Sequence, residues 1–145
     1  MKYIVTGGAG FIGSNLVDQL VEDGHEVVII DNIASGNLEN INKDARFVCF
    51  DLSKKNWPAL INSVFRGADT IFHLAALARV QPSIDYPREF HEANVNGTLN
   101  LLIGAHDAGV RRIVYSASSS AYGETTILPT PETTPTNPLS PYGVQ

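Results

Sequence analysis

The sequence predicts an α/β protein with a doubly wound parallel β-sheet and helices on both faces. Short apolar runs of strand length alternate with helical or irregular segments, and a glycine-containing turn follows the first run. Acidic or small residues follow the later runs. Right-handed crossovers bring the carboxyl ends of such strands to one edge of the sheet. We therefore expect these residues to meet at that edge, where open parallel sheets bind ligands.

Length and composition indicate one globular domain, with 145 residues, 43% hydrophobic and 17% charged. A net charge of −5 without a basic run argues against nucleic-acid binding. No apolar run approaches the roughly 20 residues of a membrane span, and Met1 leads directly into a strand, so we expect a cytoplasmic protein. Cys49 is the only cysteine. We expect it in the core, with no disulfide and no metal site.

The first apolar run leads into a turn with glycines at 7, 10 and 13. Glycines let the backbone approach a ligand closely, and the helix that follows directs its N-terminus at that ligand, where a pyrophosphate is stabilised. The spacing is one residue wider than the common dinucleotide motif, and an ordinary tight turn is the alternative. The helix, from about Phe11 to Glu22, is expected to bury Ile12, Leu16, Leu20 and Val21.

The second strand, 26–30, ends in Asp31, which lies 18 residues past Gly13. A carboxylate near this position accepts hydrogen bonds from an adenosine ribose and would repel a 2′-phosphate, so NAD is favoured over NADP. A simple strand-end acid is the alternative. The turn that follows, 32–37, contains Ser35 and Gly36 and suits the adenosine rim.

Three more strands are predicted, at 46–50, 70–74 and 112–116. The first ends in Asp51 and Leu52, and a helix from about 54 to 65 should follow, with Trp57 and Leu60 facing the sheet. His73, in the second, is expected to be a hydrogen-bonded histidine near the core. An irregular stretch, 77–87, should precede a long helix, 88–108, in which a buried asparagine could hold a neighbouring loop. A loop, 124–141, leads to a helix that starts at Tyr142.

Together these residues resemble the extended short-chain dehydrogenase/reductase family, and within it the NAD-dependent UDP-hexose 4-epimerases. The resemblance covers the whole chain and implies a Rossmann-type NAD-binding domain over residues 1–145. It also implies an isomerase that acts on nucleotide-sugars. The motifs that carry it are Thr6–Gly13, Asp31–Asn32, Asp51–Leu52, His73–Ala76, Asn94–Thr98, Ser116–Gly123 and Ser140–Tyr142.

The resemblance implies a role for each candidate residue. Ser118 would be the catalytic hydroxyl and Tyr142 the catalytic base, which also contacts the cofactor. The pyrophosphate would lie on Gly7, Gly10, Phe11, Ile12 and Gly13. The remaining cofactor contacts would come from Asp31, Asn32, Ser35, Gly36, Asp51, Leu52, Leu74, Ala75, Ala76, Asn94 and Ser116.

In the implied mechanism, a tyrosinate takes the proton of the sugar 4-hydroxyl while NAD accepts a hydride from C4. The hydride returns to the other face of the keto sugar. The family lowers the pKa of the tyrosine with a lysine four residues later, here residue 146, and the sequence ends at Gln145. We therefore expect the cofactor-binding half of an enzyme that binds a UDP-sugar and forms a homodimer when complete, with negligible turnover by this chain alone.

Two other readings of the resemblance remain. Nucleotide-sugar 4,6-dehydratases and UDP-glucuronate decarboxylases place an acid just after the catalytic serine or threonine, where this chain has Ser119 and Ser120. A non-catalytic NAD-binding module on the same fold would not need the pair Ser118 and Tyr142. Ala78 also departs from several epimerases, which have a basic residue there.

Overall fold

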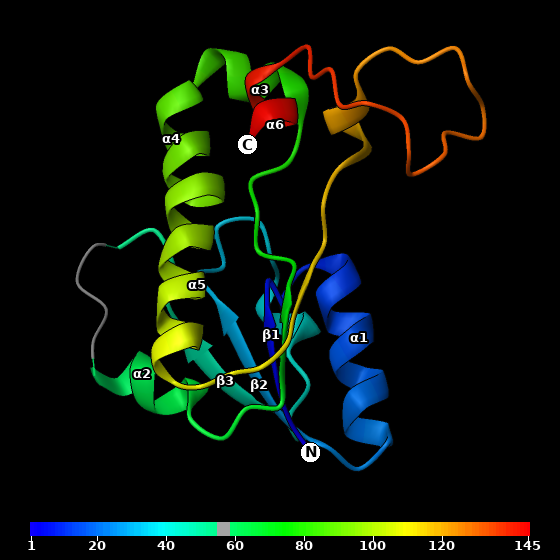
Figure 1. Ribbon diagram of the computed structural model, residues 1–145. Coiled ribbons are helices and arrows are strands. Elements are labelled where there is room, and N and C mark those ends of the chain that lie inside the picture. The colour runs from blue at the N-terminus through cyan, green and yellow to red at the C-terminus, as the bar shows by residue number, and fades with distance from the viewer. Residues whose placement is uncertain (55–58) are drawn as a thin grey trace.

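A computed structural model describes residues 1–54 and 59–145 and contains one parallel sheet, in the strand order β3-β2-β1-β4-β5 (Figure 1). The order steps outward from β1 in both directions, as expected for a doubly wound sheet. The predicted fold class is therefore confirmed. The strands are β1 Lys2–Thr6, β2 Glu26–Asp31, β3 Arg46–Cys49, β4 Thr70–His73 and β5 Ile113–Tyr115.

Helices cover both faces of the sheet because alternate strand residues point to opposite sides. Ile4 and Ile71 face α2, Ala59–Phe65, and α5, Gly97–Asp107, in one buried cluster. Val5 lies in a second cluster, together with residues of helix α1, Phe11–Glu22, on the other face (Figure 1). The two apolar clusters pack the sheet between the helices on its two faces.

Helix α1 has the predicted bounds, but the prediction that Ile12 is buried is wrong. Ile12 is 64% exposed, whereas Val17 is fully buried and Leu20 nearly so. Leu16 and Val21 are partly buried against the same cluster. The buried face begins at Gly13, which packs on the glycine turn, and this contact turns Ile12 outward.

The edge strand β3 explains a second correction. Cys49 is exposed, not a core residue, because β3 is the edge strand of the described sheet, paired with β2 on one side, and is covered incompletely. The helix after it is described as Ala59–Phe65, and the predicted start of this helix, after residue 54, lies outside the described residues. The predicted packing of Trp57 and of the Leu60 side chain lies outside the described residues.

The stretch 77–87 is not irregular throughout, because helix α3 spans Val80–Asp85. Pro82 is tolerated there because the first turn of a helix needs no backbone N–H donors. The predicted long helix is confirmed as one run: α4, Pro87–His91, a π-helical turn (η2), Glu92–Asn96, and α5. Gly109, with φ of +75°, follows its end.

The C-terminal part returns to the sheet edge. A short 3₁₀ helix, η3, spans Ser119–Tyr122, and 124–139 loop away from the rest of the molecule (Figure 1). The chain then forms α6, Pro141–Val144, which packs against α3 and η3. A second 3₁₀ helix, η1, spans Leu38–Asn40. Within the described residues, no helix is long and apolar enough to cross a membrane.

Candidate functional site

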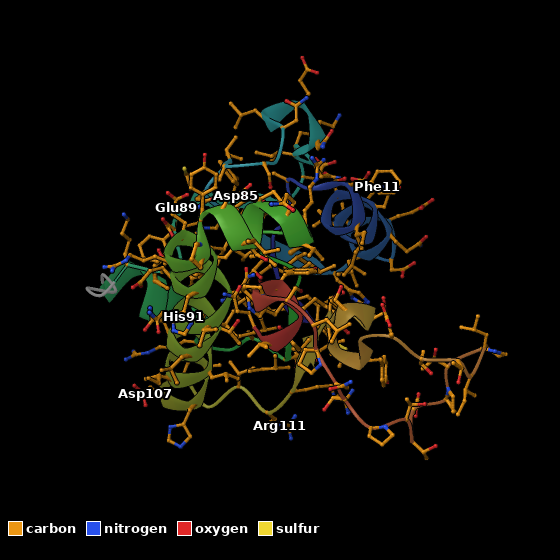
Figure 2. The ribbon with its side chains drawn as sticks, turned by 90° about the horizontal axis from the view of Figure 1, so that it is seen from above. Phe11, Asp85, Glu89, His91, Asp107 and Arg111 are labelled. Atoms are coloured by element: carbon orange, nitrogen blue, oxygen red, sulfur yellow. The ribbon has the colours of Figure 1, made fainter. Side chains whose placement is uncertain are left out.

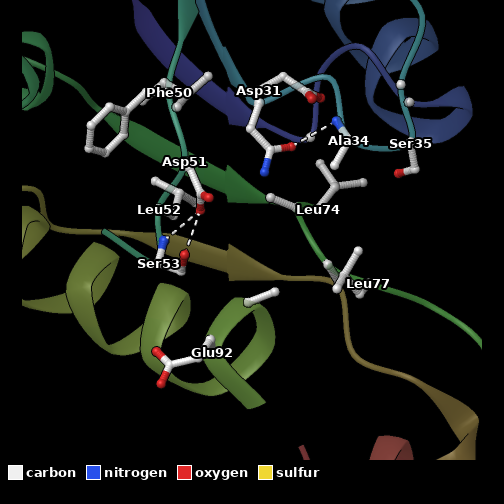
Figure 3. Close-up of a pocket in the computed structure, with 18 of the residues that line it drawn as sticks. Asp31, Ala34, Ser35, Phe50, Asp51, Leu52, Ser53, Leu74, Leu77 and Glu92 are labelled. Atoms are coloured by element: carbon white, nitrogen blue, oxygen red, sulfur yellow. Dashed lines mark hydrogen bonds between the residues drawn. The ribbon is translucent and has the colours of Figure 1, made fainter. Parts of the chain in front are cut away.

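A cavity of about 440 Å³ lies at the carboxyl edge of the sheet (Figure 3). Its walls come from the segments that follow β1, β2, β3 and β4, and from the start of the long helix. It brings together many residues that the sequence predicts as cofactor contacts. These are Gly7, Gly10, Asp31, Asn32, Ser35, Gly36, Asp51, Leu52, Leu74, Ala75 and Ala76.

The glycine turn is closely packed against the end of β4. Gly7 has φ of +71°, and a Cβ there would lie 2.7 Å from the backbone N of Ala75. A Cβ on Gly13 would collide with the carbonyl oxygen of Gly7. Glycine is thus required at both positions, by backbone conformation and close approach at Gly7 and by close approach at Gly13.

The start of α1 points at the same place. Its first helical hydrogen bond runs from the N–H of Ser14 to the carbonyl of Gly10, at 2.9 Å. The N–H groups of the first turn therefore lack acceptors within the helix. Phe11 and Ile12 are exposed and, like Gly13, do not line the cavity, and Figure 2 shows Phe11 at the start of this helix. A pyrophosphate would meet backbone N–H groups here, not these side chains.

Asp31 is oriented by two backbone donors. Its Oδ1 accepts from the N–H of Ile33 at 2.8 Å, and its Oδ2 accepts from the N–H of Ala9 at 3.0 Å. Ile33 has φ of +58°, a strained conformation for a β-branched residue. The hydrogen bond to Asp31 helps to hold that turn, so the carboxylate connects the end of β2 to the glycine turn.

Asp51 is a second acidic residue in the wall of the cavity. Burial raises the pKa of its carboxyl, but hydrogen bonds from the hydroxyl and N–H of Ser53, the charge of Lys54 and a bond from Asn32 outweigh this effect. The resulting pKa lies below the usual 3.8. The bond from Asn32 to Asp51 joins the loop after β2 to the segment after β3. Asn32 itself is held within its loop, because its Oδ1 accepts from the N–H of Ala34 at 3.0 Å (Figure 3).

Asn94 confirms the expectation of a buried asparagine that holds a neighbouring loop. Its Oδ1 accepts from the N–H of Leu77 at 2.8 Å, and its Nδ2 donates to the carbonyl of Leu77 at 3.0 Å. Asn94 is 5% exposed and lies in the π-helical turn, a rare feature that is frequent at functional sites. It does not line the cavity itself, whereas Leu77 and Ala93 do.

The candidate catalytic residues lie outside the cavity walls. Ser118 caps η3, and its Oγ accepts from the N–H of Ser120 at 3.2 Å. Tyr142 lies in the first turn of α6, which packs against η3. The elements that carry the two residues are thus neighbours. Ser116, two positions before Ser118 in the sequence, is exposed, and its N–H donates to the carbonyl of His73 at 3.1 Å.

The sequence of this chain matches a known protein family over nearly its whole length. The family described as "NAD dependent epimerase/dehydratase family" matches residues 3–145. The chain belongs to this family. Among curated members, the UDP-glucose 4-epimerases of Mycolicibacterium smegmatis and Streptomyces lividans are 44% and 39% identical to it, over 98% of the chain in each case.

Solved structures of family members agree. The UDP-glucose 4-epimerase of Thermotoga maritima, solved with UDP-glucose, is 38% identical with a TM-score of 0.92. That of Thermus thermophilus, solved with NAD, is 39% identical with a TM-score of 0.89. Each covers 99% of this chain, and the chain covers 47% of each. The chain likewise spans 47% and 43% of the length of the two curated relatives.

Several wall residues of this family member were not predicted from the sequence. Ala34 could have been, because it stands between predicted contacts. Glu92 and its helical neighbours could not, because no local pattern shows which helix will cross over the cavity. Glu92 lies on the side opposite Asp31 (Figure 3). The wall residues that were not named individually as cofactor contacts are Ile30, Ala34, Phe50, Ser53, Leu77, Arg88, Glu89, Glu92 and Ala93.

Proposed function

We propose that residues 1–145 are the NAD-binding Rossmann domain of a nucleotide-sugar 4-epimerase that acts on UDP-hexoses. One observation carries the proposal. The carboxylate of Asp31, held by two backbone donors, lines the same cavity as Gly7 and Gly10 of the glycine turn at the N-terminus of α1. UDP-glucose 4-epimerases among the relatives support the activity. The whole enzyme would include sequence that corresponds to the other half of those relatives.

The cavity suits NAD in size and chemistry. About 440 Å³ lies within the usual range of small-molecule sites. The glycine turn leaves room for a pyrophosphate next to the first turn of α1, which favours negative charge. Asp31 can accept from the ribose hydroxyls and disfavours a 2′-phosphate, so NAD fits better than NADP.

The catalytic roles proposed here rest on Tyr142 and Ser118. Tyr142 would take the proton of the sugar 4-hydroxyl as a general base. Ser118 would orient the same hydroxyl. Bound NAD would supply the hydride acceptor. A dehydratase is disfavoured because Ser119 and Ser120 offer no carboxylate after Ser118.

A homodimer of the whole protein is part of the proposal. Leu99, Leu102 and Ile103 are 52%, 46% and 52% exposed on α5 and lie at helical spacings that share one face. A second copy of α5 would cover this stripe. Analytical ultracentrifugation should show a dimer that Leu102→Glu converts to a monomer, and an unchanged monomer in both proteins would contradict it. The expected cytoplasmic location stays a prediction.

Calorimetric titration with NAD and with NADP tests the cofactor assignment. We expect NAD to bind more tightly than NADP to the folded chain, with Asp107→Ala as a control that changes an exposed acid far from the cavity. A folded chain, verified by circular dichroism, that binds neither nucleotide would contradict the proposal. Epimerisation of UDP-glucose is then assayed on a longer protein that begins with this sequence.

A further inference from the structure

His73 ends strand β4 and lies between three parts of the molecule. It is 2% exposed and does not line the cavity. Its Nδ1 is 2.6 Å from Oγ1 of Thr6, at the end of β1, and its Nε2 is 2.9 Å from Oγ1 of Thr98, on α5. The ring of Tyr115 packs beside it, with centroids 5.6 Å apart.

The neighbours of the ring assign the direction of each hydrogen bond. Thr98 donates its hydroxyl proton to the carbonyl of Asn94 at 2.5 Å, so its oxygen can only accept from Nε2–H of His73. The N–H of Ala75 donates to Oγ1 of Thr6 at 3.2 Å. Thr6 is then free to donate its own proton to Nδ1 of His73. Only the neutral ring with the proton on Nε2 satisfies every group.

The chain of hydrogen bonds connects three walls of the cavity. Thr6 directly precedes Gly7, and Ala75 is itself a wall residue. At the other end, Asn94 follows Ala93 and binds both backbone groups of Leu77, and Ala93 and Leu77 are wall residues too. These walls come from distant parts of the sequence, so their spacing depends on contacts such as these.

We propose that His73 is a positioning residue of the NAD site, which sets the distance between the glycine turn, the end of β4 and the long helix through Thr6 and Thr98. The inference rests on the proposed NAD-binding function. Burial supports it, because it lowers the pKa of His73 to about 4 and keeps the ring neutral near pH 7. His73 touches neither the cavity nor a reacting atom and has no catalytic part.

Two substitutions test the two hydrogen bonds of the His73 ring separately, because each keeps one bond and removes the other. In His73→Asn the amide oxygen replaces Nδ1 and can still accept from Thr6. In His73→Gln the amide nitrogen replaces Nε2 and can still donate to Thr98, but the Thr6 hydroxyl loses its acceptor. We expect His73→Gln, which loses the link to the glycine turn, to raise the Kd for NAD about tenfold, and His73→Asn, which loses the link to the long helix, to raise it less, about threefold. Ile71→Val, buried on the same strand, is the control and should lower Tm without changing the Kd.

A double-mutant cycle tests the connection itself. Thr6→Val removes the hydroxyl and should raise the Kd about tenfold, whereas Thr6→Ser should restore it. The effects of Thr6→Val and His73→Gln should not add in the double variant. Kd values equal to that of the wild-type chain in both single variants, or fully additive effects, would overturn the inference.

Nitrogen NMR of the ring separates this inference from the proposed function. Between about pH 6 and about pH 8 we expect the neutral tautomer with the proton on Nε2. A proton on Nδ1, in either a neutral or a charged ring, would overturn the inference whatever the chain binds. A folded chain with the expected tautomer that fails to bind NAD would instead contradict the proposed function.

Discussion

The backbone N–H of Ala9 donates a hydrogen bond to Oδ2 of Asp31 at 3.0 Å, across 22 positions of sequence. The acid that is expected to bind the ribose therefore also holds the glycine turn that is expected to bind the pyrophosphate. The two subsites share one carboxylate, so a change in one is expected to disturb the other.

Asp31→Ala should weaken NAD binding and the fold together. It removes the acceptor of Ala9 and Ile33 and leaves two backbone donors without a partner, at a cost of about 1–3 kcal/mol. We expect the Kd for NAD to rise at least about tenfold and the preference over NADP to shrink. Calorimetry and urea unfolding measure the two effects. Asp31→Asn keeps the shape, and equal affinity in that variant would argue against a role of the charge.

Gly7→Ala and Gly24→Ala separate two effects of an added Cβ atom. Both variants strain the backbone, but only Gly7→Ala also brings the Cβ against neighbouring backbone atoms. Both glycines have positive φ, +71° and +78°, but a Cβ on Gly24 would meet no atom within 4 Å. Gly24→Ala should cost about 1–2 kcal/mol and leave NAD binding unchanged. Gly7→Ala should cost more and abolish detectable binding, because the new methyl group meets the backbone at Ala75. Similar losses of affinity in the two variants would contradict this.

Asn94→Ala should loosen the loop at Leu77. The substitution leaves the N–H and carbonyl of Leu77 without their partner, so we expect a loss of about 2 kcal/mol in unfolding free energy. Hydrogen exchange of the Leu77 amide should become faster. Asn15→Ala, on the exposed face of α1, is the control and should change neither quantity, and an unchanged Leu77 exchange rate in Asn94→Ala would be the contrary result.

Acid should destabilise the protein partly through His73. Its pKa is about 4 in the folded chain and about 6.5 when unfolded, so its contribution is complete above about pH 6.5 and is lost as pH falls toward 4. A shift of this size corresponds to about 3 kcal/mol. Urea unfolding at about pH 7.5 and about pH 4.5 should show a smaller decrease for His73→Asn than for the wild-type chain. Equal decreases would mean that another group dominates.

Local sequence patterns are sufficient to predict those features of the structure that depend on one residue or on one helix turn. The glycine turn, Asp31 at a strand end and the end of the long helix near residue 108 are all predicted, because backbone conformation and strand length act over a few residues. Ile12 and Cys49 were predicted wrongly, because the buried side of a helix and the exposure of an edge strand depend on what packs against them.

The sequence by itself determined the class of fold and the residues that follow each strand, since apolar periodicity and turn chemistry are local properties. Only the tertiary structure decided which of those residues meet. The crossover of the long helix brought Glu92 to the wall opposite Asp31, and the pairing of β1 with β4 set Thr6 beside His73. Such contacts depend on sheet register and on packing between segments far apart in the chain, and no short stretch of sequence records them.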